Sequence, residues 1–210
     1  MATVKGPLFS MDASGQLAGS VVFSKWKGRN YVRRHAVPAN PKSALQVGTR
    51  SMMRFLSQEW DGLSALPAAS WEEPAEALSI SPFNRFVGMN MDLWTLFKAP
   101  SVYSIIQTAD TPGTIANGAV TAEILSIKVE FDVTVLAQNW GVAIFRKIGS
   151  APGESRGECV HVMNADSAAS YSWVDINVTV GSDYYYDVTP FSMNSVWGTE
   201  HQCGNAVAAA

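Results

Sequence analysis

The stretch VVFSKWKGRNYVRRHAVPANPKSALQVGTRSMMRFLSQEW, residues 21–60, decides how the first part of the chain folds. Residues 21–26 have the composition of a β-strand. Residues 27–30, Lys-Gly-Arg-Asn, include Gly and Asn, the residue types that tolerate the positive φ of a hairpin turn. Residues 31–33 begin a return strand, and two prolines soon after it end strand pairing. The stretch therefore predicts a β-hairpin, with Trp26 and Tyr31 on either side of its turn.

An amphipathic helix is predicted to follow the hairpin. Asn40 is a favoured N-cap residue, and Pro41 suits the first helical position. The helix is expected to end near Trp60, before an Asp-Gly pair. Residues of its inner face recur at the 3.6-residue helical spacing: Leu45, Thr49, Met52, Met53, Leu56 and Trp60.

The same stretch carries charge of one sign. It holds eight of the chain's fifteen Lys and Arg residues, with no Asp or Glu between Lys25 and Arg54. Residues 1–54 have a net charge of +8 and residues 55–210 a net charge of −11. This asymmetry predicts contact between copies or with an acidic partner, although two solvated surfaces of different sign are the alternative. The protein-docking residues that we predict are Lys25, Trp26, Lys27, Arg29, Tyr31, Arg33, Arg34, Arg50 and Arg54.

A second helix is predicted to start at Ser81 and Pro82, again a cap residue followed by proline. The apolar residues from Phe83 to Phe97 are expected to be core. A Ser-Trp-Glu-Glu sequence at residues 70–73 resembles a capping box, but the proline after it limits that helix to a short turn. Two helices beside a hairpin predict an α+β domain over residues 1–106.

The second half of the chain has the pattern of short β-strands. Residues 107–113 read as a linker, and turn signals then recur at regular intervals, which is typical of a β-sandwich. We therefore expect an all-β domain over residues 107–210. The strands that we predict are residues 123–134, 140–148, 158–163, 172–180 and 184–191.

Residues 181–191, GSDYYYDVTPF, resemble the loop and Tyr-rich strand of fibronectin type III and related immunoglobulin-like modules. The resemblance implies that alternate residues of this strand face the core. It also implies a late turn near residues 195–198 and a last strand near residues 205–209. The expected fold class is thus an α+β domain followed by an immunoglobulin-like sandwich.

The first 95 residues resemble structural proteins of tailed bacteriophages. The resemblance is carried by VFSKWKGRNYVR at residues 22–33 and PANPKSALQVGTR at residues 38–50. It implies a building block of the head, neck or tail, followed by an immunoglobulin-like appendage and assembled in the bacterial cytoplasm. The implied partners are capsid, portal or tail proteins and further copies of the chain. The family supplies no catalytic residues.

Other function classes have weaker support. The hairpin's cations and aromatic residues would also suit nucleic acid, but the sequence pI is about 5.6. An adhesin is the main alternative, and it would bind host glycan or protein through residues 151–156 and 194–200, with Trp197 and Tyr171 exposed. The three His residues have no convincing Ser or Asp companion, so no enzyme is expected. No stretch of the sequence is apolar for 18 residues, so no membrane span is expected.

One pattern of metal-ligand residues needs a separate test. Cys159 and His161 are two residues apart, as are His201 and Cys203, and residues two apart on a strand share a face. Four such ligands would suit tetrahedral zinc if the two segments met. In a fibronectin-like sandwich these strands are not neighbours, so no metal or other cofactor is expected.

Overall fold

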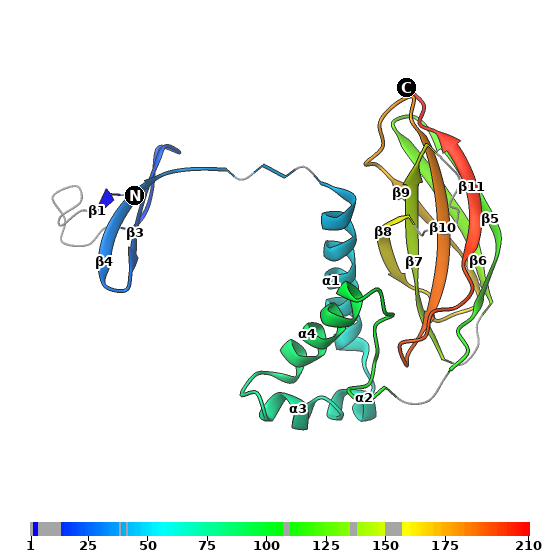
Figure 1. The fold of residues 1–210 in the computed structure, drawn as a ribbon, viewed down its shortest axis with the longest axis horizontal. Coiled ribbons are helices and arrows are strands. Elements are labelled where there is room, and N and C mark those ends of the chain that lie inside the picture. The colour runs from blue at the N-terminus through cyan, green and yellow to red at the C-terminus, as the bar shows by residue number, and fades with distance from the viewer. Residues whose placement is uncertain are drawn as a thin grey trace. The chain divides into compact units, whose positions relative to one another are not determined.

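The computed structural model describes residues 2–3, 14–37, 39–40, 42–106, 110–134, 138–149 and 157–210. It divides into two compact units, Met1–Pro41 and Lys42–Ala210, and each is described by itself (Figure 1). The division falls elsewhere than the predicted domain boundary between residues 106 and 107. None of the helices in the described part of the chain is both long and apolar enough to cross a membrane.

The first unit is a small antiparallel sheet in the order β1-β4-β3-β2. Lys27 and Gly28 both have positive φ, the backbone of a two-residue type I′ turn, and they connect β3 to β4. The turn is therefore shorter than the four residues predicted. The strands are β1 (Ala2–Thr3), β2 (Gly15–Leu17), β3 (Val21–Trp26) and β4 (Arg29–Arg34).

The second unit begins with helices. The first helix, α1 (Ala44–Gly62), has Ser43 as its N-cap residue, so it starts three residues later than predicted from Asn40 and Pro41. Its buried face is also rotated from the predicted one, because Leu45 is 69% exposed. The buried residues of α1 are Gly48, Ser51, Met52, Phe55 and Leu56.

Three further helices follow: α2 (Ala65–Ala69), α3 (Glu72–Glu76) and α4 (Pro82–Thr95). As predicted, Ser81 caps α4, and its hydroxyl accepts a hydrogen bond from the Asn84 amide at 3.2 Å. Asn90 is buried on α4, where its side chain exchanges two hydrogen bonds with the Ser101 backbone. These hydrogen bonds fix the segment that follows α4 against the helix.

The remaining strands form two facing antiparallel sheets, which is the predicted β-sandwich at the level of architecture. One sheet has the order β5-β6-β9 and the other β11-β10-β7-β8. Side chains such as Ile127, Phe131 and Tyr186 fill the space between them. The strands are β5 (Thr114–Glu123), β6 (Ser126–Thr134), β7 (Asn139–Ile148), β8 (Glu158–Asn164), β9 (Ala169–Asp175), β10 (Asp183–Ser192) and β11 (His201–Val207).

The observed strands differ from the predicted ones at three places. The strand predicted over residues 123–134 begins only at Ser126, because Glu123 ends the preceding strand β5, which was not predicted. The strand predicted over residues 172–180 ends at Asp175. The last strand begins at His201, earlier than predicted, because it pairs with β10 along the sheet edge.

The helices cover the outer face of the larger sheet, so the second unit has three layers (Figure 1). On β7, Val142 and Ile144 face the sandwich core while Ala143 and Phe145 face the helices. A strand covered on both faces reads as a continuous apolar run, as β7 does. The helices predicted to close a domain with the hairpin therefore share their core with the sandwich instead, and the α+β domain over residues 1–106 is not what the structure shows.

Candidate docking surfaces

The hairpin of the first unit presents a basic and aromatic face. In the β3–β4 register, Trp26 is opposite Arg29, Ser24 opposite Tyr31 and Val22 opposite Arg33. Directly opposed residues, and residues two apart on a strand, share a face. We call the resulting set the hairpin surface: Trp26, Arg29, Tyr31 and Arg33.

The tip of this surface is strongly exposed. Trp26 is 66% exposed, and the Lys27 ammonium lies 4.8 Å from the centre of its ring. Lys25 and Arg34 lie on the other face, at the ends of a row that includes Phe23 and Val32. Every side chain described between residues 14 and 40 is at least partly exposed. The described part of this sheet therefore has no fully buried core of its own.

Arg50 and Arg54, the other predicted docking residues, belong to α1 of the second unit. Both are exposed, one helical turn apart. Burial, followed by the positive charge of Arg54, lowers the pKa of His161 to about 4. That imidazole stacks on Trp173 with ring centres 5.1 Å apart, and its Nδ1 is 3.2 Å from the Ser51 hydroxyl. The neutral ring is thus part of the contact between α1 and the sandwich.

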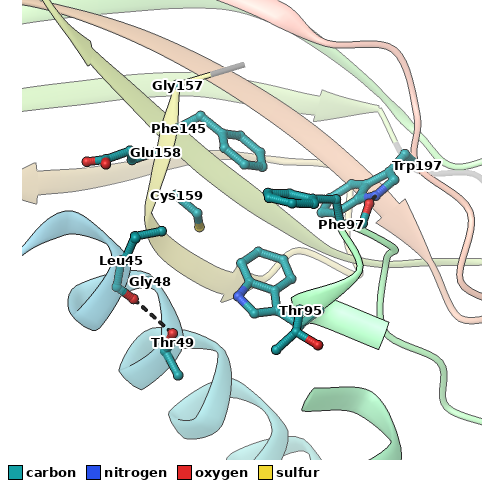
Figure 2. A pocket seen from close by; sticks show the side chains of 11 residues that line it. Leu45, Gly48, Thr49, Thr95, Phe97, Phe145, Gly157, Glu158, Cys159 and Trp197 are labelled. Carbon is teal, nitrogen blue, oxygen red and sulfur yellow. Dashed lines mark hydrogen bonds between the residues drawn. The ribbon is translucent and has the colours of Figure 1, made fainter. Parts of the chain in front are cut away.

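A pocket that the sequence did not predict opens in the second unit (Figure 2). It has a volume of about 470 Å³ and lies between the first turns of α1, the end of α4 and the outer face of the larger sheet. Leu45, Phe97 and Phe145 point toward one another around it in Figure 2. The residues that line it are Leu45, Gly48, Thr49, Trp94, Thr95, Phe97, Phe145, Gly157, Glu158, Cys159 and Trp197.

Aromatic contacts form one wall of this pocket. The Trp197 ring centre lies 6.1 Å from that of Trp94 and 6.2 Å from that of Phe145. Trp197 also donates a hydrogen bond from Nε1 to the Phe97 carbonyl at 3.1 Å. Among the lining residues the only ionisable acid other than a thiol is Glu158, which is exposed. The pocket is therefore suited to an apolar or aromatic group, with a carboxylate at its edge.

Two side chains at this pocket have notable chemistry. Burial raises the pKa of the Cys159 thiol to about 12, so it stays protonated and is a poor nucleophile. Phe97 has a φ of +58°, a conformation that bulky residues rarely adopt. The backbone bonds from Phe97 to Trp94 and from Lys98 to Leu93 form a Schellman motif at the end of α4. Phe97 thus occupies the position that glycine usually takes, and at 86% exposed it is not the core residue predicted from the sequence.

The two Cys-His pairs do not meet. Cys159 and His161 are on β8, whereas His201 and Cys203 are on β11, at opposite edges of the β11-β10-β7-β8 sheet. Three strand spacings separate the edges, roughly 14 Å, too far for four ligands to share one zinc ion. Among the residues that the structure describes, no cluster of His, Cys, Asp and Glu is suited to hold a metal.

Of the two segments predicted for an adhesin, the structure describes one. Residues 194–200 follow β10. Residues 151–156 lie outside the described residues. Trp197 is half-buried in the pocket wall, and Tyr171 stacks on Phe131 with ring centres 6.0 Å apart.

Comparison with models of known protein families and with curated proteins finds no match for this chain. The pocket was missed because its aromatic residues come from α4, β7 and the loop after β10, so no local pattern joins them. One local feature of the sequence could have indicated the pocket. The segment after α4, Leu-Phe-Lys-Ala-Pro at residues 96–100, ends a helix without the expected glycine.

Proposed function

We propose that the chain is a non-enzymatic structural component of a bacteriophage particle, in its head, neck or tail. In this proposal it docks through the hairpin surface and projects an immunoglobulin-like domain. The observation that carries the proposal is the pairing of a small basic unit with a larger acidic one. Residues 1–41 have a net charge of +5 and residues 42–210 a net charge of −8. The resemblance of residues 22–50 to virion proteins is the reason for proposing a phage particle as the assembly.

The composition and exposure of the hairpin surface support docking. Trp, Tyr and Arg are the residues that contribute most at protein interfaces, and this surface combines one Trp, one Tyr and two Arg. Small sheets bury too little apolar surface to be very stable alone. A partner that covers this sheet would bury side chains that the described part of the unit leaves partly exposed. The guanidinium groups would pair with carboxylates of that partner.

The strand order supports an immunoglobulin-like appendage. If β5, β6, β7, β8, β9, β10 and β11 are strands A, B, C, C′, E, F and G, the two sheets are A-B-E and G-F-C-C′. Tyr184 supplies a second, independent feature. It is the second residue of β10, is buried, and its phenol oxygen accepts a hydrogen bond from the Thr179 amide at 2.8 Å. A Tyr near the start of strand F that bonds to the backbone just upstream matches the tyrosine corner of this fold.

The test is incorporation into particles. Replacing Arg29, Arg33 and Arg34 together by Glu reverses the charge of the hairpin but removes no buried side chain. We expect the variant to keep the circular dichroism and unfolding midpoint of the wild type and to be absent from purified particles. The control reverses Lys98 and Lys147 of the second unit, and it is expected to be incorporated normally. Normal incorporation of the triple variant would contradict the proposal.

Crosslinking mass spectrometry on purified particles would then identify the partner. Crosslinks from Lys25 or Lys27 to acidic residues of a capsid, portal or tail protein are expected. Their position would distinguish head, neck and tail. Recovery of the chain only from the lysate, free of particles, would reject a structural role.

A further inference from the structure

The pocket beside Phe97 has the features of a binding site rather than of core. A bulky residue in the left-handed region costs roughly 1–2 kcal/mol relative to glycine. Phe97 occupies that region although its side chain is 86% exposed, so it contributes little to the core in return. Leu45, on the facing helix, is 69% exposed. A contact between Phe97 and a ligand would explain why an exposed aromatic residue occupies a position where it destabilises the monomer.

We propose that this pocket receives Trp26 from the hairpin tip of a second copy of the chain. The proposal rests on the docking role given to the hairpin surface, and it names one partner of that surface. The contact is between two different surfaces, a tip on one copy and a pocket on the next. Such heterologous contacts repeat, and they close into rings when the rotation between copies permits.

The shape of the tip fits the pocket. Trp26 immediately precedes the two-residue turn and is 66% exposed. Neighbouring strands are about 4.8 Å apart, so the end of a hairpin is narrow. A volume of about 470 Å³ is sufficient for one large side chain. Trp94, Phe145 and Trp197 offer ring edges and faces against which an indole packs well.

The charges are also complementary. Lys27 and Arg29 lie beside Trp26 at the hairpin tip, and Lys25 precedes it on the other face. The sequence has no acidic residue between Asp12 and Glu59. The charged lining residue of the pocket is Glu158, an exposed carboxylate at its edge. An entering tip would therefore bring cations toward this carboxylate. An acidic or strongly polar ligand has no cation among the lining residues to receive it.

Disulfide trapping tests this contact through a cysteine at position 45, because Leu45 lines the pocket and is exposed. The donor chain carries Trp26→Cys, Cys159→Ser and Cys203→Ala, and the acceptor chain carries Leu45→Cys, Cys159→Ser and Cys203→Ala. After mild oxidation of an equimolar mixture, we expect a disulfide between residue 26 of the donor and residue 45 of the acceptor. The matched control donor places its cysteine at Ser20, an exposed turn residue of the same unit. It is expected to give no crosslink.

A second variant of the acceptor makes the test specific to the pocket. Thr49 lines it from an exposed position on α1, so Thr49→Trp fills the space without entering the core. This change is expected to abolish the crosslink. In sedimentation experiments, Trp26→Ala should weaken self-association of the otherwise native chain by about 30-fold or more, the loss typical of a central interface residue.

Two results would overturn the proposal: no crosslink between donor and acceptor, or equal crosslinking from residue 20. Failure of this proposal is distinguishable from failure of the docking role. If the tip does not enter the pocket but the Arg29, Arg33 and Arg34 triple variant is still lost from particles, the hairpin docks on a different protein.

Discussion

Gly48→Ala is the most direct test of how α1 packs on the sandwich. A Cβ atom at Gly48 would lie 2.4 Å from the Cys159 carbonyl oxygen and 3.2 Å from its carbon. Ordinary contacts between such atoms begin near 3.4 Å, so the helix or strand must move by roughly 1 Å. The obstructing atom belongs to the β8 backbone, which cannot rotate away as a side chain can.

Two opposite effects determine the magnitude. Ala is favoured over Gly inside a helix by about 1 kcal/mol. Overpacking costs about 1–3 kcal/mol, and the upper end applies here because the movement also disturbs neighbouring contacts. Ser51 lies one turn further along α1, and its hydroxyl accepts a hydrogen bond from the Val162 amide at 2.8 Å. We therefore expect a net loss of about 2 kcal/mol in the free energy of unfolding.

Urea unfolding followed by tryptophan fluorescence measures this loss. The matched control is Gly88→Ala in α4, where a Cβ would meet nothing within 4 Å. That change should stabilise the protein by about 0.5–1 kcal/mol. The same substitution is thus predicted to act in opposite directions in two helices. A Gly48→Ala protein as stable as the wild type would refute the close packing of α1 on β8.

Four further substitutions test other parts of the second unit. Asp175→Asn should destabilise the second unit by about 3–5 kcal/mol in chemical unfolding, because it removes the carboxylate partner of the largely buried Arg146 side chain, 2.6 Å away. The control Lys128→Met, at a more exposed ion pair, should leave stability near that of the wild type. The folded pKa of His161 lies near 4, below its usual 6.5, so the unfolded chain takes up a proton first, and stability should fall as pH drops from 6.5 to 4. His161→Gln should flatten that part of a stability–pH curve, and an unchanged slope would contradict the assigned burial. Phe97→Gly should raise the unfolding free energy by about 1 kcal/mol by removing the left-handed strain, and a loss of stability would show that the ring is structural.

Several local features were predictable from the sequence because they depend on neighbouring residues. Gly28 and Asn30 predicted a hairpin turn within residues 27–30, although the turn itself is only residues 27 and 28. Ser81 followed by Pro82 predicted the start of α4 for a similar reason. The turn signals after residue 110 predicted a two-sheet architecture, although not its exact strands.

The buried face of α1 and the pocket were decided only by tertiary structure. The helical periodicity places Leu45 and Phe55 on two different faces, either of which could be buried. It does not predict which of the two faces a sheet distant in the sequence will cover. Ser51 contacts Val162, more than a hundred residues away, and Gly48 permits that contact because it lacks a side chain. The sequence by itself determined the local elements and the separation of charge. Which elements share a core depends on surfaces that form only when distant segments pack together, and for that reason the helices belong with the sandwich and not with the hairpin.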